Sequence, residues 1–570
     1  MKSVFTLFLI TILGGVWNTI QAQAELSKKE LEHAFQKGAF YTSLKLALQE
    51  PEKVYKLKLR GMQGHIKRIN KQLKIAQDSL VSIDTLGVPE KRKNKIKSLL
   101  AKEVKKLKLE REYFNLDSLS KLTKLVVLDL SLNDIPALPA DLGNLVNLHH
   151  IYLDNNKLTS LPKSIGQLKN LEELTVRKNE LNTLPDGICD LNNLKILLLD
   201  HNGLKGVPSR FGELDSLQVL YLNNNFISSL PSSFSKLKLL GSLMLQYNSL
   251  SESPKGLTSF LELKELHLEH NNITLLPNDL GNLKKLKSLF LNKNNIANIP
   301  ESIGKLVNLK HLQFSNNNLS FIPNGLTKLV NLEALHLDHN EIPSIPEGIS
   351  ELINLKELYL DHNKITNIPK EIGRLVDLHT LFLSHNNIAI LPKTIGLLDK
   401  LSELHVNNNE ISEFTHGLGY LNQLVTLHME HNKVTAIPDS TIEGMTRLEV
   451  LFMDNNQLSA IPDSIGALPR LKRLYLSNNQ ISKLPKTIGM LKKLNLLSLD
   501  YNQIERLPEN INSLSHLIYL YLKSNQLIEM PESFSEMYNL QHVELNDNPM
   551  KNRHKNKIRR KAPPKTIVYI

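Results

Sequence analysis

A phrase of the form Leu-x-x-Leu-x-Leu-x-x-Asn recurs nineteen times in this chain of 570 residues, and it constrains the fold more than any other feature. Seventeen of the eighteen intervals between its asparagines are 23 residues, and only Asn432 to Asn456 is 24. A fixed period of this length predicts a solenoid, in which each unit buries its apolar face against its neighbours. The asparagines are Asn133, Asn156, Asn179, Asn202, Asn225, Asn248, Asn271, Asn294, Asn317, Asn340, Asn363, Asn386, Asn409, Asn432, Asn456, Asn479, Asn502, Asn525 and Asn548.

Within each unit the Leu-x-Leu segment alternates like a strand with one buried face. In the unit around residues 355–360, Leu358 and Leu360 should point inward while Glu357 and Tyr359 point outward. The asparagine should end the strand at a turn and satisfy backbone amides of its own and the adjacent unit. A Leu-Pro step and an Ile-Gly-x-Leu step usually follow and should form the return path, where proline needs no N–H in the sheet.

The repeats resemble the leucine-rich repeat family, in its 23-residue Leu-Pro type, and are similar to exported bacterial leucine-rich repeat proteins and to Ras-binding and Scribble-type scaffolds. The resemblance implies an α/β solenoid, a leucine-rich repeat horseshoe with a parallel concave β-sheet. It also implies a helical N-terminal region, a helix–strand C-terminal cap and a binding role for the concave face. The expected regions are a signal peptide (1–24), an N-terminal cap with degenerate repeats and a basic helical insert (25–112), the solenoid (113–548) and the C-terminal cap (549–570).

The N-terminal residues have the pattern of a secretory signal peptide. Lys2 precedes an apolar run from Val4 to Trp17, and the small-x-small step ending at Ala24 predicts cleavage near that residue. The run is short for a membrane span, so none is expected. Absence of a following cysteine argues against a lipid anchor. We therefore expect an exported protein of a bacterial type, secreted, periplasmic or on the cell surface.

Two stretches between residues 63 and 104 have helical spacing. One contains Ile66, Ile69, Leu73, Ala76 and Leu80, and the other contains Ile96, Leu99, Leu100 and Val104. Residues 27–50 also have helical spacing, and residues 51–59 resemble a first strand. The pattern predicts a helical hairpin inserted between degenerate coils, with residues 104–109 returning to a strand.

Two repeats depart from the common form. After Asn409 the Leu-Pro step is replaced by Phe414-Thr415, which predicts a locally irregular coil. The 24-residue unit carries its extra residue after Ile437-Pro438, which predicts a longer loop on the convex side.

The net charge of +12 is unevenly distributed. Residues 25–112 hold 22 Lys+Arg against 11 Asp+Glu, and residues 549–570 hold eight Lys+Arg and no acid, which leaves the repeats with a net charge of −8. An acidic solenoid between basic ends is a poor candidate for binding nucleic acid. We interpret the basic tail as a cap for the last coil, because the apolar end of a solenoid needs covering. A charged partner patch is the alternative.

No signature of catalysis is present, so no enzymatic activity and no cofactor are expected. Cys189 is the single cysteine and stands where the repeat usually has glycine, which favours a structural role over a reactive thiol.

The outward strand position is rich in aromatic residues and histidine, although the chain is only 5% aromatic. Such side chains are favoured at interface centres, and the alternative is cross-strand stacking that only stabilises the sheet. We predict twelve partner-binding residues in this column: Tyr152, Tyr221, His267, Phe290, His336, Tyr359, Phe382, His405, His428, Phe452, Tyr475 and Tyr521. The other members are Asp129, Thr175, Leu198, Met244, Gln313, Ser498 and Glu544.

Histidine also precedes the asparagine in several repeats, with His339, His362 and His385 in three consecutive coils. A zinc site there is conceivable, but a straight column converges poorly on one ion, so no metal site is predicted. The leading hypothesis is an exported, non-enzymatic protein that binds a protein, or alternatively a glycan, through its concave sheet. The alternative is a signalling scaffold of the Ras-binding or Scribble-like type.

Overall fold

Each repeat forms one short strand and one tight turn in the computed structural model, which describes residues 47, 54, 56–59, 63–82, 97–105 and 116–570. The chain divides into two units, Met1–Leu250 with Pro254–Leu263, and Ser251–Ser253 with Lys264–Ile570. The predicted signal peptide lies outside the described residues, as does the helical pattern of residues 27–50 apart from Ala47. The predicted α/β solenoid with a parallel sheet is confirmed.

The first unit contains the parallel strands β1 to β7, paired in register between successive repeats. Their bounds are β1 (Lys56–Lys58), β2 (Val127–Asp129), β3 (His150–Tyr152), β4 (Glu173–Thr175), β5 (Ile196–Leu198), β6 (Val219–Tyr221) and β7 (Ser242–Met244). The 3-10 turns of this unit are η3 (Leu116–Lys121), η4 (Leu142–Asn144), η5 (Lys163–Gln167), η6 (Asp186–Asp190), η7 (Phe211–Glu213), η8 (Ser232–Lys236) and η9 (Leu257–Ser259).

The second unit continues the same pattern from β8 to β21, again with parallel pairing between neighbours. The strands are β8 (Glu265–His267), β9 (Ser288–Phe290), β10 (His311–Gln313), β11 (Ala334–His336), β12 (Glu357–Tyr359), β13 (Thr380–Phe382), β14 (Glu403–His405), β15 (Thr426–His428), β16 (Val450–Phe452), β17 (Arg473–Tyr475), β18 (Leu496–Ser498), β19 (Tyr519–Tyr521), β20 (His542–Glu544) and β21 (Ile567–Tyr569).

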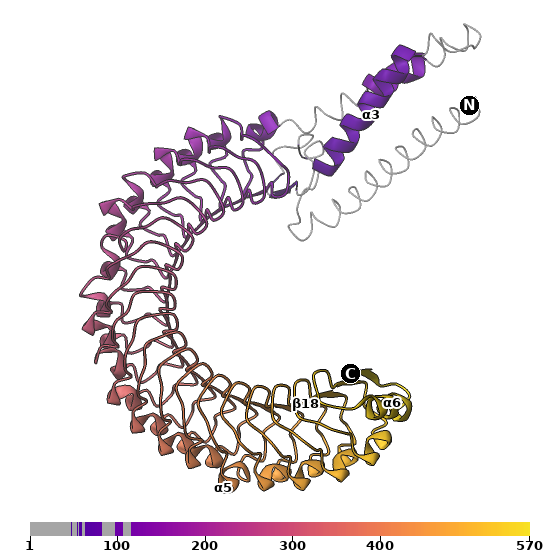
Figure 1. Cartoon of the computed structure of the whole chain (residues 1–570). Coiled ribbons are helices and arrows are strands. Elements are labelled where there is room, and N and C mark those ends of the chain that lie inside the picture. Colours follow the sequence, from indigo (N-terminus) through magenta and orange to yellow (C-terminus); the bar gives the residue numbers. More distant parts are fainter. Residues whose placement is uncertain (1–46, 48–53, 55, 60–62, 83–96, 106–115) are drawn as a thin grey trace, which may run out of the picture. The chain divides into compact units, whose positions relative to one another are not determined.

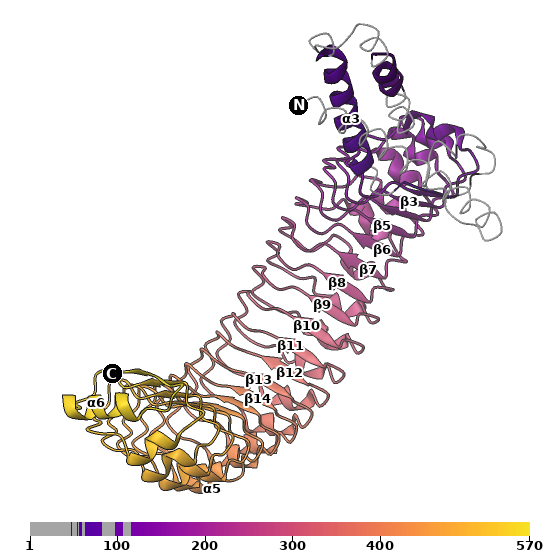
Figure 2. The same ribbon diagram turned by 90° about the vertical axis from the view of Figure 1, so that its right-hand side faces the viewer.

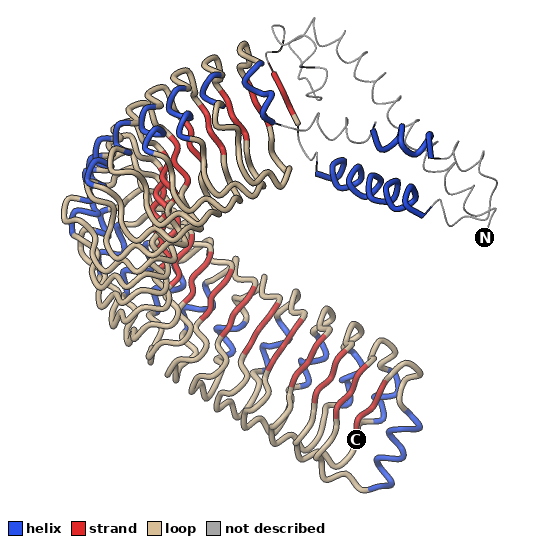
Figure 3. The backbone as a smooth tube through the Cα atoms, turned by 90° about the horizontal axis from the view of Figure 1, so that it is seen from above, coloured by secondary structure: helices blue, strands red, loops and turns tan. Residues whose placement is uncertain are grey.

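Within each unit the strands and the helices lie on opposite sides (Figure 1, Figure 3). Short helices follow the strands of the second unit. They are η10 (Leu280–Asn282), η11 (Glu301–Lys305), η12 (Leu326–Lys328), η13 (Glu347–Glu351), η14 (Lys370–Arg374), η15 (Lys393–Leu397), η16 (His416–Tyr420), α5 (Asp439–Ile442), η17 (Asp463–Ala467), η18 (Lys486–Met490), η19 (Glu509–Ser513), η20 (Glu532–Glu536) and α6 (Asn552–Lys561).

The repeat phrase explains the path of each coil. Leu358 at the middle of β12 and Leu360 just after it are fully buried, whereas Glu357 is exposed and Tyr359 is half-buried. His362 then adopts a left-handed backbone with φ of 51° and turns the chain away from the strand. Pro369 is extended, with φ of −66° and ψ of 147°, and leads into η14.

The buried asparagines link each coil to the preceding one. The Asn363 amide donates to the carbonyls of Leu337 at 3.0 Å and Leu360 at 3.1 Å, and its oxygen accepts from the Ile342 N–H at 3.0 Å. The predicted ladder is therefore confirmed, but most of its bonds satisfy carbonyls and not the amides that the sequence suggested. A buried carbonyl left without a donor is costly, so this residue fixes the turn.

The first irregularity predicted from the sequence is wrong. Thr415 takes the extended conformation of the usual proline, with φ of −61° and ψ of 141°, and η16 follows it as in other coils. Phe414 is buried, so it occupies the position of the usual leucine. The second prediction is confirmed, because the extra residue of the 24-residue unit is accommodated where α5 replaces the 3-10 turn.

The predicted helical insert is present between β1 and β2. Helix α3 (Gln63–Ser82) and the helical residues 97–105 pack through Ile69, Leu73, Ala76 and Val104 (Figure 2). The predicted strand at residues 104–109 is wrong at its start, since Val104 is helical, and residues 106–109 lie outside the described residues. The strand that pairs with β1 is β2, so the insert interrupts a single step of the sheet.

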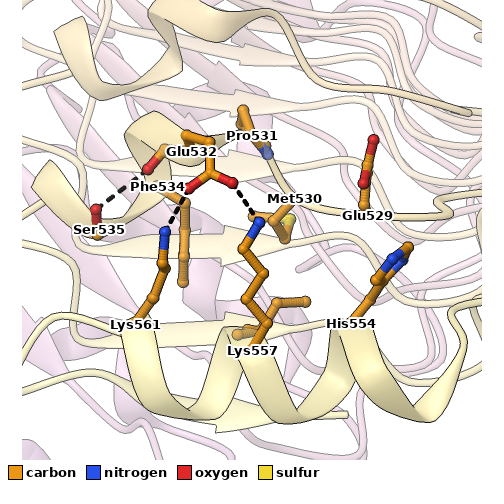
Figure 4. A pocket seen from close by; sticks show the side chains of 10 residues that line it. Glu529, Met530, Pro531, Glu532, Phe534, Ser535, His554, Lys557 and Lys561 are labelled. Atoms are coloured by element: carbon orange, nitrogen blue, oxygen red, sulfur yellow. Dashed lines mark hydrogen bonds and ion pairs between the residues drawn. The ribbon is translucent and has the colours of Figure 1, made fainter.

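The basic tail forms the helix–strand cap that the sequence predicted. Ile558 of α6 is buried against the last coil, and β21 pairs with β20. Glu532 of η20 bridges Lys557 and Lys561 (Figure 4). These two lysines lower the pKa of Glu532 to about 2. Part of the positive charge in the tail is therefore paired with an acidic residue of the solenoid.

Candidate functional site

The outward column predicted from the sequence lies on the third residue of each strand. Parallel register places Tyr359 beside His336 on one side and beside Phe382 on the other. Successive parallel strands are about 4.8 Å apart, close enough for neighbouring rings to stack. The repeat length alone therefore decides which side chains become neighbours.

Seven of these rings form a continuous stack, which we call the ring ladder. The ring centroids of His336 and Tyr359 are 4.2 Å apart, and those of Tyr359 and Phe382 are 4.7 Å apart. The next steps are 3.9, 4.2, 4.1 and 4.5 Å, with interplanar angles of 11–17°. The ring ladder comprises His336, Tyr359, Phe382, His405, His428, Phe452 and Tyr475.

Stacking covers the faces of the rings and leaves their edges toward solvent. The side chains of His336, His405 and His428 are only 22%, 19% and 22% exposed, although they point away from the leucine core. Burial among neighbours lowers the pKa of His336 and lowers that of His405 to about 4, with His428 adding to the effect at His405. These two imidazoles are therefore neutral at physiological pH and add no positive charge to the ring ladder.

The other predicted residues lie outside the ring ladder. His267 and Phe290 form a separate pair with centroids 4.5 Å apart, and Gln313 separates them from His336. Tyr521 lies near Tyr519 and His542 beyond the interruption at Ser498, with centroid distances of 6.4 Å and 5.2 Å.

In the first unit, Tyr152 and Tyr221 lie in different parts of the column, because Thr175 and Leu198 stand between them. The Tyr152 hydroxyl donates to Glu173 at 2.8 Å, and burial, followed by this bond, raises the pKa of Tyr152 to about 12. The twelve predicted residues thus form one continuous group and several separate ones.

Two rows of polar residues flank the ring ladder. On one side Glu357 and Glu403 lie 3.9 Å from the ring nitrogens of His336 and His405. On the other side the carboxylate of Glu430 lies 3.3 Å from His428 Nδ1. The site residues predicted from the sequence did not include Glu357, Glu403 or Glu430. Their spacing two residues before or after a column member could have identified them.

A second histidine column runs beside the strands. The rings of His339, His362 and His385 stack with centroid distances of 4.1 and 4.0 Å. All three have positive φ of 51–55°, a conformation that histidine adopts more readily than most residues. Among the described residues, no group of three or more metal-binding side chains could hold an ion. The recurrence of histidine at this position thus has a backbone explanation.

Cys189 is fully buried in η6, and burial raises the pKa of its thiol to about 11. A thiol of high pKa is a poor nucleophile, as expected for a residue that fills space.

Comparison with known proteins identifies the family. Residues 103–220, 247–358, 343–457 and 459–558 match the profile described as a leucine-rich repeat region, and residues 193–250 match a second leucine-rich repeat profile. The chain therefore belongs to the leucine-rich repeat family. A search of curated proteins found no match.

Several solved structures are similar. A leucine-rich repeat protein of Leptospira interrogans is 26% identical over 93% of this chain and 100% of that one, with a TM-score of 0.50. The ectodomain of the receptor kinase GASSHO1/SCHENGEN3 from Arabidopsis thaliana, in complex with CASPARIAN STRIP INTEGRITY FACTOR 2, is 30% identical over 76% of this chain and 60% of that one, with a TM-score of 0.59. The Arabidopsis receptor kinase HAESA, in complex with the peptide hormone IDA and the co-receptor SERK1, is 27% identical over 80% and 84%, with a TM-score of 0.58.

Within the part of the chain that the structure describes, no helix has the length and apolar character needed to span a bilayer.

Proposed function

We propose that this chain is an exported, non-enzymatic binding protein, and that the ring ladder is the centre of its surface for a protein partner. The observation that carries the proposal is the uninterrupted run of seven rings on the solvent side of the sheet. Aromatic side chains supply much of the binding energy at interface centres, because they bury a large area at a small entropic cost. The neighbouring strand leucines Leu358 and Leu381 are fully buried on the other face of the sheet.

Stacking also bears on the chemistry of the partner. A sugar ring packs its C–H face onto the open face of an aromatic ring, whereas each inner ring of the ladder has both faces against its neighbours. A polypeptide can lie along the ring edges and fill the shallow steps between them. We therefore favour a protein ligand over a glycan. Two of the similar structures support this class, since HAESA is bound to the peptide hormone IDA and GASSHO1/SCHENGEN3 to CASPARIAN STRIP INTEGRITY FACTOR 2.

Export rests on the predicted signal peptide of residues 1–24, and we retain residues 25–112, 113–548 and 549–570 as the proposed regions of the mature chain. Cell fractionation tests this assignment. Processed protein outside the cytoplasm supports an exported bacterial binding protein. Recovery of uncleaved protein in the cytosol would favour the signalling-scaffold alternative, which could use the same surface.

Capture of a partner from cell-surface extracts tests the proposed surface. Residues 25–570 serve as bait, beside the double variant Tyr359→Ala/Phe382→Ala, and captured proteins are identified by mass spectrometry. Truncation of a central aromatic side chain commonly costs about 2 kcal/mol of binding free energy or more, so the double variant should lose capture.

A matched control keeps the rings. The variant Tyr359→Phe/Phe382→Tyr exchanges one hydroxyl between adjacent coils and preserves the stack, so it should retain most of the capture. Both variants should keep the circular dichroism spectrum of the wild type. Undiminished capture by the alanine variant would show that the ladder is only a structural stack.

A further inference from the structure

We propose that the segment bound along the ring ladder is an extended, cationic peptide, with basic side chains that reach Glu357 and Glu403 on the flank that precedes the rings. This inference rests on the proposed function and specifies the chemistry of its partner. It starts from the two rows beside the ladder in coils β11 to β17, in which Glu357 and Glu403 are exposed and several smaller side chains are buried. The row before the rings is Ala334, Glu357, Thr380, Glu403, Thr426, Val450 and Arg473, and the row after them is Asp338, Asp361, Ser384, Asn407, Glu430, Asp454 and Ser477.

Five of the seven coils contribute a carboxylate to these rows. The rows contain six carboxylates, and the one lysine or arginine among them is Arg473 in the last coil. Negative charge beside an aromatic strip favours a partner that offers both contact area and positive charge. The repeats as a whole share this sign, with a net charge of −8 between two basic ends.

The carboxylates are close enough to the rings to act on the same ligand. Glu357 and Glu403 have side chains 48% and 50% exposed, and each approaches a ladder imidazole at 3.9 Å. Glu430 lies on the opposite flank, but its side chain is only 19% exposed and its second carboxylate oxygen is buried, so it contributes charge and not a direct contact. Since His336 and His405 resist protonation, they do not neutralise these acids at pH 7.

The spacing of the exposed acids fits an extended backbone. Glu357 and Glu403 begin β12 and β14, which are two coils, or about 9.6 Å, apart. Three residues of polyproline II span about 9.3 Å, and every third side chain points the same way. A peptide that runs along the ladder with a basic residue at every third position can therefore place successive charges over both glutamates.

Three synthetic peptides of equal length test the inference on the full mature chain by fluorescence anisotropy. The first has lysine at every third position, separated by alanine and serine. The second has glutamate in place of lysine, and the third has the composition of the first with its lysines clustered at one end. Measurements at about pH 7.5 keep Asp361 and Asp454 ionised, because burial raises the pKa of each to about 6.

We expect the spaced lysine peptide to bind at least about tenfold more tightly than the glutamate peptide, and more tightly than the clustered one, with affinity falling as salt rises. The variant Glu357→Gln/Glu403→Gln should weaken the spaced peptide about fivefold. The control Glu347→Gln/Glu351→Gln removes the same charge from η13 on the helical side, where both side chains are exposed, and should leave affinity unchanged.

Equal or tighter binding of the glutamate peptide would overturn the cationic inference, as would no binding of the spaced lysine peptide at millimolar concentration. An unchanged affinity in Glu357→Gln/Glu403→Gln would also overturn it. If binding keeps its charge preference but survives Tyr359→Ala/Phe382→Ala, the proposed ladder surface fails instead. The two failures are therefore distinguishable.

Discussion

The third residue of each strand points away from the leucine core in both units, but the side chains at this position differ between the units. In the first unit, this position in β3 to β7 holds Tyr152, Thr175, Leu198, Tyr221 and Met244. The Tyr152 hydroxyl donates a hydrogen bond to Glu173. In the second unit, β11 to β17 carry rings at every step, and the rings stack. The repeat therefore fixes where a side chain lies, and only the residue at that position decides whether a continuous surface forms.

The largest expected effect tests whether the buried asparagines stabilise the two units equally. Asn202 in the first unit and Asn363 in the second each donate to a carbonyl of the same coil and one of the preceding coil, and each accepts one N–H. Asn202→Ala and Asn363→Ala should each cost about 2–4 kcal/mol, because several buried groups lose their partners. Hydrogen exchange read by mass spectrometry should show faster exchange around the altered coil in both variants. Protection lost in only one unit would show that the scaffolds differ.

A substitution inside the ladder separates ring stacking from apolar burial. Tyr359→Leu keeps an apolar side chain but removes two ring contacts, and it should cost about 1–2 kcal/mol of unfolding free energy in a denaturant titration. Phe452→Tyr keeps the stack and serves as the control. A Tyr359→Leu variant as stable as the wild type would show that stacking adds nothing to burial.

The converse change should create a ring contact in the first unit. Leu198 pairs in register with Tyr221, so Leu198→Phe should stack on it and gain about 0.5 kcal/mol. Thermal unfolding is the measurement. A loss of stability would mean that the first unit does not accept the geometry of the second.

Titration of His405 in the ladder and of Asp361 beside it should change the stability of the fold by small amounts of opposite sign. The folded pKa of His405 is about 4, below its ordinary 6.5, so its protonation destabilises the fold as pH falls through that window. His405→Phe should therefore raise the melting temperature more at about pH 4.5 than at about pH 7.5. The folded pKa of Asp361 is raised from 3.8 to about 6, so its ionisation destabilises the fold as pH rises through that window.

Asp361→Asn should accordingly raise the melting temperature more at about pH 7.5 than at about pH 4.5. We expect changes of a few degrees at most in either variant. The same pH trend in both would contradict the assignment of opposite signs.

The sequence was sufficient to place the column but not to show its continuity. The 23-residue period and the alternation of the strand put Tyr359 beside Phe382, but stacking depends on side-chain torsions that no spacing encodes. The error at Thr415 came from treating proline as necessary for the turn, whereas threonine reaches the same φ unaided. A strand was predicted at residues 104–109, between β1 and β2, but Val104 is helical. The sequence therefore did not show that β1 pairs directly with β2.

We propose that recognition belongs to the ring ladder and not to aromatic residues of the column in general. The most direct test is the affinity of the captured partner, by calorimetry, for two matched variants, Tyr359→Ala/Phe382→Ala from the ladder and Tyr152→Ala/Tyr221→Ala from the first unit. Each removes two rings from the same strand position. We predict that the ladder variant loses at least about 2 kcal/mol of binding free energy and that the first-unit variant binds like the wild type. Equal losses in both variants, or a loss confined to the first-unit variant, would show that the ring ladder is not the centre of recognition.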